Sequence, residues 1–282
     1  MPVTLLGAAE IRRLAASLDI TPTKKLGQNF VVDANTVRRI VQVARVTATD
    51  RVVEIGPGLG SLTLAILETG APVTAVEIDH RLAARLAETA SAHGVPEGAL
   101  TVVDADALRV TELPGDPDVL VANLPYNISV PVMLHFLETF PGLQRGVIMV
   151  QAEVGERMAA GPGSKIYGAP SVKAAWYGAW RLGGTVSRQV FWPVPNVDSV
   201  LVAFTLDSEP RGTEQERRRT FAIVDAAFQQ RRKMLRQALA GVVGATAAEA
   251  SALLERAGVA PTARGEELSV EDYVRIARIS VS

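Results

Sequence analysis

The stretch VVEIGPGLGSL, residues 52–62, joins a strand-like run to a helix-like run through three closely spaced glycines. Val52, Val53 and Ile55 are typical of a buried strand, and residues 58–70 have the apolar spacing of a helix. Glycines in such a turn let a ligand approach the backbone, and a helix N-terminus favours polar or anionic groups. The stretch predicts a strand–turn–helix unit of an α/β fold, with either a ligand site or a plain tight turn at its centre.

The same alternation continues along the first half of the chain. Short apolar runs that favour strands alternate with longer runs of helical spacing. The expected strands are residues 51–55, 72–78, 99–106, 118–123 and 146–151, and the expected helices include 79–94 and 129–140. This rhythm predicts a doubly wound, mainly parallel sheet with both faces covered.

Past residue 151 the pattern changes. Residues 159–171 are rich in Gly, Pro and Ser and favour a loop. Residues 174–187 and 197–206 resemble two longer strands that finish the sheet as a hairpin, and FWPVPN (191–196) is an extended connection between them. From about 214 onward the spacing is helical, with a capping pattern at Ser269 and Asp272. We therefore expect a catalytic domain over 1–207 and a small helical domain over 208–282.

Composition limits the chemistry. The chain has no cysteine, which excludes disulfides, thiol catalysis and thiolate metal sites and suits a reducing cytosol. The three histidines share no ligand-like spacing, so no metal site is expected. No apolar run reaches the roughly 20 residues that span a bilayer, and residues 1–18 favour an amphipathic helix with Ile11, Leu14, Ala15 and Leu18 on one face.

Charge is distributed unevenly. Residues 1–49 hold seven Lys and Arg against three acids, and residues 217–236 hold seven against one. Residues 50–116 carry eleven acids and four bases. A charge run is often only a solvated face, but two basic ends around an acidic middle also suggest a polyanionic partner, with nucleic acid first.

Polar side chains stand where successive strands are expected to end. The first strand runs into Gly56, the second ends in Glu77, the third in Asp104 and Asp106, and the fourth in Asn123. An acid at the second strand can accept both ribose hydroxyls of an adenosine-containing cofactor. Each acid alone could be a helix N-cap, but together they favour a nucleoside-type cofactor site. NAD is the rival ligand, and the loop fits its G-x-G-x-x-G fingerprint poorly because Ser61 holds the last position.

VANLPYNIS, residues 121–129, follows the fourth strand with an amide, a proline and an aromatic residue. Asn and Pro are ordinary turn residues, so the tetrapeptide NLPY has a plain interpretation as a turn. The alternative is a binding site for a planar base that carries an amino group.

Together these stretches carry a family resemblance. VVEIGPGLGSL, AVEID, DAD and NLPY occur in the order of the cofactor motifs of class I S-adenosylmethionine-dependent methyltransferases, which have a Rossmann-like sheet. KKLGQNFVVD (24–33), NLPYNIS, SKIYG (164–168), FWPVPNVDS (191–199) and AFQQRRKML (227–235) narrow the match. The chain resembles the KsgA-type family of small-subunit ribosomal RNA adenine dimethyltransferases from about residue 22 to the C-terminal helices.

The resemblance implies the methyl donor and the catalytic residues. S-adenosyl-L-methionine would donate methyl groups to N6 of two adjacent adenosines near the 3′ end of 16S rRNA, within the small ribosomal subunit or its precursor. Asn123 Oδ1 and the Leu124 carbonyl would accept hydrogen bonds from N6, Pro125 would fix the turn, and Tyr126 would stack on the flipped base. Phe191 is the expected second stacking face; its alternative role is a hydrophobic plug that closes the sheet.

The remaining site residues also follow from the resemblance. The implied cofactor contacts are Gln28, Asn29, Val31, Glu54, Gly56, Gly58, Glu77, Ile78, Asp106, Ala107 and Asn123. Asp106 is preferred to Asp104 for the adenine because Asp106-Ala107-Leu108 aligns with the motif. A basic helix with the sequence QQRRKML would contact RNA phosphates, or would simply be a solvated face. Its implied RNA-binding residues are Arg231, Arg232, Lys233 and Arg236.

Three other functions share some of these features. An Erm-type large-subunit rRNA adenine methyltransferase has the same fold and motif order, but NLPYNIS, SKIYG and RRKML favour the KsgA type. A ribosome-assembly factor that acts mainly by binding is a second alternative. A DNA adenine methyltransferase is a weaker one, because nothing in the chain looks like a sequence-reading domain. The resemblance also implies a cytoplasmic monomer.

Overall fold

The computed structural model describes residues 2–20, 29–125, 128–244 and 246–280. A seven-stranded sheet has the strand order β4-β3-β2-β5-β6-β9-β7, and a small second sheet pairs β1 with β8. The strands are β1 Phe30–Val31, β2 Val52–Ile55, β3 Val73–Glu77, β4 Leu100–Asp104, β5 Val119–Asn123, β6 Arg145–Gln151, β7 Gly178–Val186, β8 Phe191–Trp192 and β9 Ser199–Leu206. The α-helices are α1 Ala8–Ser17, α2 Ala34–Ala44, α3 Ser61–Leu67, α4 His80–Ala92, α5 Ser129–Thr139, α6 Ala152–Met158, α7 Ala169–Ala175, α8 Glu214–Gln229, α9 Leu235–Ala238, α10 Ala240–Val243, α11 Ala247–Arg256 and α12 Val270–Ile279.

The large sheet is mainly parallel. β2 pairs in parallel with both β3 and β5, so that Val52 lies between Val73 and Val119. β4 continues the parallel pairing beyond β3, and β6 continues it beyond β5. β9 runs antiparallel to β6. The predicted doubly wound sheet is therefore confirmed, and the carboxyl ends of β2 to β5 meet at one edge.

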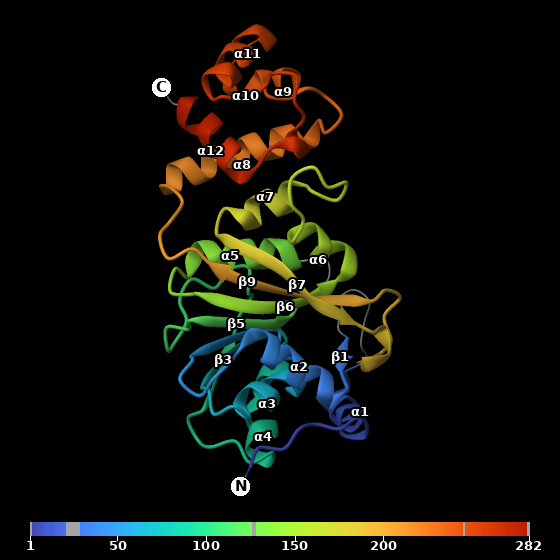
Figure 1. The fold of residues 1–282 in the computed structure, drawn as a ribbon. Helices are drawn as coiled ribbons and strands as arrows, with labels where there is room; N and C mark the ends of the chain where they lie inside the picture. Colours follow the sequence, from blue (N-terminus) through green and yellow to red (C-terminus); the bar gives the residue numbers. More distant parts are fainter. Residues whose placement is uncertain (1, 21–28, 126–127, 245, 281–282) are drawn as a thin grey trace. The chain divides into compact units, whose positions relative to one another are not determined.

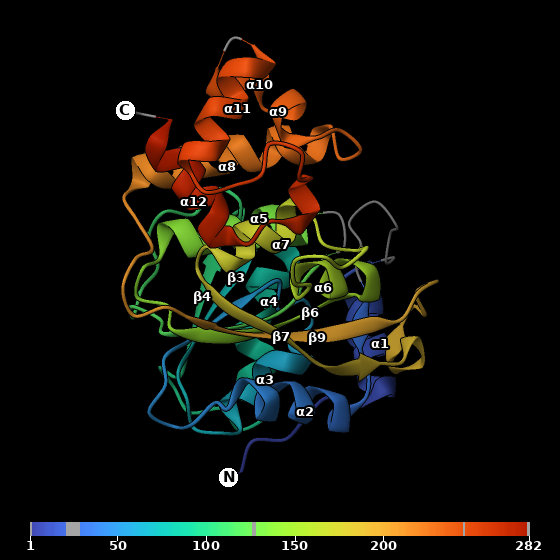
Figure 2. The ribbon, with the colours of Figure 1, turned by 45° about the horizontal axis from the view of Figure 1, so that its top comes forward.

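Helices cover both faces of this sheet. Figures 1 and 2 show α2 and α3 on one face and α5 on the other. One buried cluster joins Ile40 of α2 and Ile66 of α3 to Val52 and Val121 of the sheet. With both faces covered, the central strands β2 and β5 are buried along nearly their whole length, which explains their continuous apolar runs.

The predicted N-terminal helix is confirmed as α1. Ile11 and Ala15 are fully buried, and they share an apolar cluster with Phe30, Leu59 and Leu82. Leu14 and Leu18, also predicted on this face, pack against the same cluster. α1 thus packs against residues of β1, the glycine loop and α4.

The chain forms two compact units, with unit 1 comprising Met1–Gly155 and Arg181–Leu206 and unit 2 comprising Glu156–Trp180 and Asp207–Ser282. The predicted boundary at 207/208 lies next to one junction between the units. The prediction missed the other junction, because it kept residues 156–180 in the catalytic domain. Tyr167 and Trp176 explain the difference, since they are buried in the same cluster as Ile223 and Tyr273 of unit 2.

Two segments have a different secondary structure from the one expected. α7 covers the end of the predicted loop 159–171 and the start of the predicted strand 174–187, and β7 begins only at Gly178. The predicted basic helix QQRRKML is wrong, because α8 ends at Gln229 and residues 230–232 form a turn.

Tertiary contacts explain the end of α8. Leu235 is fully buried, and its backbone N–H bonds to the Ala263 carbonyl at 2.8 Å. The Arg236 N–H bonds to the Pro261 carbonyl at 3.1 Å. These bonds require the chain to leave the helical path before α9, although the local sequence favours a helix. The predicted cap of α12 is confirmed, because Ser269 Oγ accepts the Asp272 N–H at 3.2 Å.

Among the helices that the structure describes, none combines the length and the apolar character that a bilayer crossing requires.

Gly146→Ala tests the packing of β6. A Cβ at this position would come within 2.2 Å of the Leu120 carbonyl oxygen and 2.6 Å of the Phe204 ring. We expect the free energy of unfolding to fall by about 3 kcal/mol or more. Urea denaturation measures it, with Gly142→Ala as the control because a Cβ there meets only the Pro117 carbonyl at 3.7 Å. Equal stability of the two variants would contradict this packing.

Candidate active site

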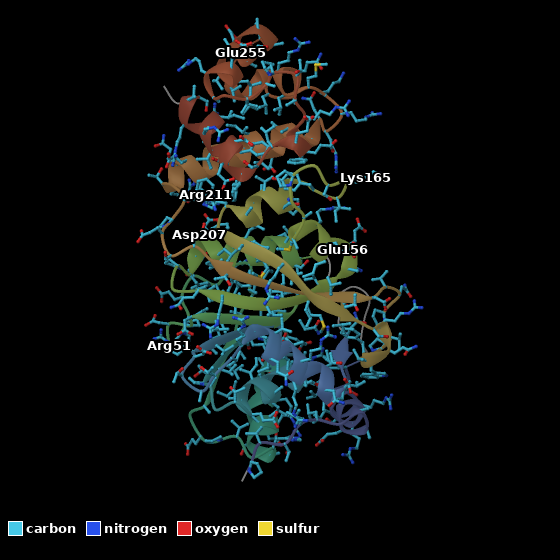
Figure 3. All side chains as sticks on the ribbon, viewed as in Figure 1. Arg51, Glu156, Lys165, Asp207, Arg211 and Glu255 are labelled. Atoms are coloured by element: carbon cyan, nitrogen blue, oxygen red, sulfur yellow. The ribbon has the colours of Figure 1, made fainter. Side chains whose placement is uncertain are left out.

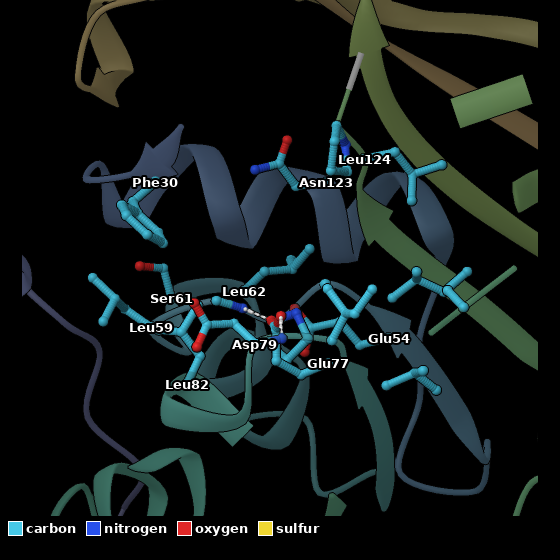
Figure 4. Close-up of a pocket in the computed structure, with 18 of the residues that line it drawn as sticks. Phe30, Glu54, Leu59, Ser61, Leu62, Glu77, Asp79, Leu82, Asn123 and Leu124 are labelled. Carbon is cyan, nitrogen blue, oxygen red and sulfur yellow. Dashed lines mark hydrogen bonds between the residues drawn. The ribbon is translucent and has the colours of Figure 1, made fainter. Parts of the chain in front are cut away.

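A cavity of about 260 Å³ lies at the edge of the sheet where the parallel strands end. Figure 4 shows it with Asn123 and Leu124 at the top of the view and Glu77 and Asp79 below them. Most of the residues predicted from the sequence lie in its wall. They are Asn29, Val31, Glu54, Gly56, Gly58, Glu77, Ile78, Asp106, Ala107, Asn123, Leu124 and Pro125.

Three predicted residues are not placed there. Gln28 and Tyr126 lie outside the described residues. Phe191 is only 2 % exposed, belongs to the core cluster of unit 1, and pairs through β8 with Val31 of β1. This position matches the alternative interpretation of Phe191, a hydrophobic plug, and does not match a stacking face on the cavity.

The glycine loop between β2 and α3 needs its glycines. Gly56 and Gly58 have φ angles of +67° and +58°, which residues other than glycine rarely adopt. A Cβ on Gly58 would also lie 2.9 Å from the Phe30 ring, whereas one on Gly56 would have no neighbour within 4 Å. The loop therefore packs closely against Phe30 at Gly58 and leaves open space beside Gly56.

Glu77 ties this loop to the end of β3. One carboxylate oxygen accepts the Gly58 N–H at 3.0 Å, and the other accepts the Asp79 N–H at 3.0 Å. Burial raises the pKa of Glu77, and these backbone donors oppose the rise. A carboxylate can accept about four hydrogen bonds, so these backbone donors leave acceptor capacity for a ligand. Glu77 is thus fixed in position and still able to accept hydroxyl groups.

Glu54 is the most deeply buried acid of the cavity wall. It is 1 % exposed, and no described residue bonds to its Oε2. Burial, followed by repulsion from Glu77, raises its pKa to about 8. An unpaired buried carboxyl group is costly, so Glu54 suits a ligand that brings positive charge or donors.

The negative charge of the cavity wall argues against ligands that carry a pyrophosphate, such as NAD. Glu54, Glu77, Asp79 and Asp106 line the cavity, and its described residues include no lysine, arginine or histidine. A pyrophosphate would meet like charge there, which argues against NAD; a cation would be stabilised. No group of three or more His, Cys, Asp or Glu side chains within the described ranges could hold a metal ion.

The structure separates the two acids that follow β4. Asp106 lies in the cavity wall and accepts the Leu108 N–H at 2.9 Å. Asp104 lies outside the lining and pairs with His80. The sequence could not separate them, because both belong to one short DAD run at the end of the strand.

Asn123 and Leu124 present acceptors to the cavity. Asn123 Nδ2 donates to the Asn29 carbonyl at 3.2 Å, and no described residue donates to Oδ1. The Leu124 N–H bonds to the Met149 carbonyl at 3.1 Å, and its own carbonyl receives no bond from the described backbone. Pro125 continues the turn through its carbonyl, which accepts the Ile128 N–H at 3.3 Å. Asn123 Oδ1 and the Leu124 carbonyl, from two successive residues of the cavity wall, thus accept no hydrogen bond from the described residues.

The predicted RNA-binding residues lie in unit 2, on and after the turns that follow α8. Arg232 and Lys233 are exposed, and Arg236 is half-buried in α9. Arg231 is engaged, because its Nε bonds to Glu266 at 2.7 Å. The sequence predicted that these four residues lie on one basic helix, but the structure places them in the segment after α8 and in α9.

Several lining residues carry no signal in the sequence that marks them as part of a site. They are mostly apolar and belong to β1, the glycine loop, α3 and α4; they include Phe30, Leu59, Ser61, Leu62 and Leu82. Ser61 was noticed only as a mismatch to the NAD fingerprint. The apolar residues gave no separate signal, because their helical spacing is also that of an ordinary core.

Comparison with known proteins supports the motif-based resemblance. The family model described as "Ribosomal RNA adenine dimethylase" matches residues 21–281. A protein of Leifsonia xyli subsp. xyli named ribosomal RNA small subunit methyltransferase A is 67 % identical, over 97 % of this chain and 98 % of its own. A protein of the same name from Streptomyces coelicolor is 58 % identical, over 99 % of this chain and 98 % of its own.

Solved structures agree on the fold. A dimethyladenosine transferase from Plasmodium falciparum has a TM-score of 0.75 at 24 % identity, covering 86 % of this chain and 94 % of that one. The 23S rRNA methyltransferase ErmE has a TM-score of 0.67 at 27 % identity, covering 90 % of this chain and 100 % of that one. The predicted methyltransferase fold is confirmed, as are the enzyme class and its methyl donor, S-adenosylmethionine. The chain belongs to the ribosomal RNA adenine dimethylase family.

Proposed function

We propose that this chain transfers methyl groups from S-adenosylmethionine to N6 of two adjacent adenosines near the 3′ end of 16S rRNA, twice on each base, during biogenesis of the small ribosomal subunit. The names of the relatives at 67 % and 58 % identity support the small-subunit substrate. The observation that carries the proposal is the orientation of Asn123, whose Nδ2 donates to Asn29 and whose Oδ1 is left for a ligand.

This orientation suits an exocyclic amine. The lone pair of N6 is delocalised into the adenine ring, so N6 is a poor nucleophile until its hydrogens are held out of the ring plane. Asn123 Oδ1 and the Leu124 carbonyl provide two acceptors for the two N–H groups, which lets the lone pair point at the methyl donor. The donor is a sulfonium, so no strong base has to act first, and Tyr126 supplies a stacking face for the base.

The acidic cavity suits the methyl donor. S-adenosylmethionine supplies an electrophilic methyl group and brings a sulfonium and an ammonium. Glu77 would accept the ribose hydroxyls, and Asp106 the adenine amino group. Gly56 would leave room for the methionine part, and Glu54 would face the positive charge. Asn29, Val31, Gly58, Ile78 and Ala107 complete the proposed contacts.

The partner is rRNA within the small subunit or its precursor. Arg232, Lys233 and Arg236 of unit 2 support phosphate contacts, which are largely independent of sequence. Specificity would come from RNA shape and from which unpaired adenines reach Asn123. We further propose that the enzyme acts as a cytoplasmic monomer without a metal.

Methyl transfer to two substrates tests this function against the Erm-type alternative. The structural similarity to the 23S rRNA methyltransferase ErmE is the observation that supports this alternative. Labelled S-adenosylmethionine is supplied with small subunits that lack the dimethylation, and separately with protein-free large-subunit rRNA. We expect N6,N6-dimethyladenosine in the small subunit alone. Label in the large-subunit rRNA would reject the proposal, and binding without label in either would indicate an assembly factor.

Asn123→Ala separates catalysis from cofactor binding. The variant loses the oriented acceptor, so we expect turnover on small subunits to fall by about 10²-fold or more, by analogy with the loss of one transition-state hydrogen bond. Affinity for S-adenosylmethionine, measured by calorimetry, should stay mostly intact. Methylation at the normal rate would refute the role of Asn123.

Asp106→Asn and Asp104→Asn form a matched pair. Asp106 lies in the cavity wall and Asp104 does not, so only the first change should weaken binding of S-adenosylmethionine, by about tenfold. Calorimetry at one pH measures both dissociation constants. The reverse pattern would assign the adenine contact to Asp104.

Glu54→Gln tests the buried carboxyl group. The pKa of Glu54 rises from 4.5 to about 8 on folding, so between these values the folded protein holds a proton that the unfolded chain releases. The contribution of Glu54 to the free energy of unfolding is therefore largest below pH 4.5. It decreases as the pH rises towards 8, by an amount on the order of 5 kcal/mol. Urea denaturation of cofactor-free protein from pH 5 to 8 should show a shallower decline for the variant. Parallel curves would contradict the burial of a neutral Glu54.

A further inference from the structure

Three segments of unit 2 meet at the Arg231 side chain. Arg231 Nε bonds to Glu266 Oε2 at 2.7 Å, and Arg231 Nη2 bonds to the Lys165 carbonyl at 2.7 Å. The Gly163 N–H bonds to the Glu266 carbonyl at 2.8 Å. These contacts join the loop before α7, the turn after α8, and the 3-10 helix η2 (Gly265–Glu267).

The loop before α7 is held on both sides of its tip. Gly163 fixes one side through the bond to Glu266. Tyr167 fixes the other side, because it is 2 % exposed and its hydroxyl donates to the Leu268 carbonyl at 2.9 Å. Lys165 and Ile166, at the tip between these anchors, remain exposed. Figure 3 labels Lys165 on this loop.

The side chains around this junction are basic and apolar. Lys165, Arg232 and Lys233 are exposed, and none of them forms an ion pair with another described residue. Ile166 and Met234 are 40 % and 38 % exposed. We call Lys165, Ile166, Arg232, Lys233 and Met234 the tip surface. Arg231 adds little charge to it, because Glu266 neutralises the guanidinium.

We propose that the tip surface is one RNA-docking surface, and that Arg231 is the positioning residue that assembles it. Arg231 holds the Lys165 loop beside Arg232 and Lys233 and does not itself contact RNA. This changes the role that the sequence suggested for Arg231 and adds Lys165 and Ile166 to the surface. The identity of the RNA rests on the proposed function.

The chemistry of the tip surface favours RNA over an acidic protein. Unpaired cations on long flexible side chains suit backbone phosphates, and the binding they give depends strongly on salt. Ile166 and Met234 would lie against sugars or unstacked bases between the phosphate contacts. A planar guanidinium is needed for the assembly itself, because it must reach Glu266 and the Lys165 carbonyl at once, which an ammonium cannot do in the same geometry.

The first test measures the phosphate contacts. Dissociation constants for small subunits that lack the dimethylation are measured at several KCl concentrations. Lys165→Gln and Arg232→Gln should each lower the slope of log affinity against log salt by about 0.7 to 1. Arg256→Gln is the control, because it removes the same charge from an exposed position on α11. If Lys165→Gln and Arg232→Gln have the same slope as the control, these residues make no phosphate contacts and the proposed RNA-docking surface is wrong.

The second test separates positioning from contact. Arg231→Lys keeps the charge but breaks the two-acceptor arrangement, so we expect binding to weaken at least fivefold, with a higher KM and an unchanged kcat. Glu266→Ala should also weaken binding, although it removes a negative charge. The double variant should bind small subunits with about the same affinity as the single variants, because both changes break the same contact. Wild-type binding by Arg231→Lys, or tighter binding by Glu266→Ala, would make Arg231 a phosphate contact and overturn the proposal.

Two further readings complete the test. Amide hydrogen exchange should accelerate over residues 163–168 in Arg231→Lys and Glu266→Ala and stay unchanged in Arg232→Gln. If the salt slopes change with intact subunits but not with protein-free small-subunit rRNA, the surface binds a ribosomal protein and the RNA assignment fails. Methyl transfer by the wild type, measured on the same subunits, decides the proposed function separately, so either claim can fail while the other stands.

Discussion

The parallel pairing of β2 with β3 on one side and β5 on the other is the constraint on which the site depends. Parallel strands bring their carboxyl ends to one edge, so Gly56, Glu77 and Asn123 converge although they are far apart in the sequence. Glu77 then fixes the arrangement locally, because its two oxygens hold the backbone of the glycine loop and of the turn before α4. A cavity lined by acids follows from this edge.

The acidity of the cavity connects packing to chemistry. Glu54 is buried without a cationic partner, which is unfavourable in the empty protein and favourable once a sulfonium is bound. The apolar wall formed by Phe30, Leu59 and Leu82 is supported from behind by α1, so the N-terminal helix contributes to the site without touching its centre. The Asn29 carbonyl, next to Phe30 in the chain, fixes the amide of Asn123. Cofactor charge and base orientation are thus set by different parts of one unit.

The sequence predicted those features that depend on local pattern. Apolar strands ending in Gly56, Glu77 and Asn123, and the cap at Ser269, were readable because each leaves a signal within a few residues. The end of α8 was not readable, since bonds from Leu235 and Arg236 to residues near 261–263 decide it. Phe191 was placed on the pocket by resemblance, but its burial in the core depends on pairing with β1. Contacts between distant segments account for these differences.

The decisive experiment is the structure of the protein bound to S-adenosylhomocysteine and adenosine, because it shows which atoms hold the N6 amino group. We expect N6 of the adenosine to lie about 3 Å from both Asn123 Oδ1 and the Leu124 carbonyl oxygen, at hydrogen-bond distance, with Glu77 on the ribose hydroxyls of the cofactor product. An adenine whose N6 points away from both acceptors, or an Asn123 turned so that Nδ2 faces the base, would contradict it.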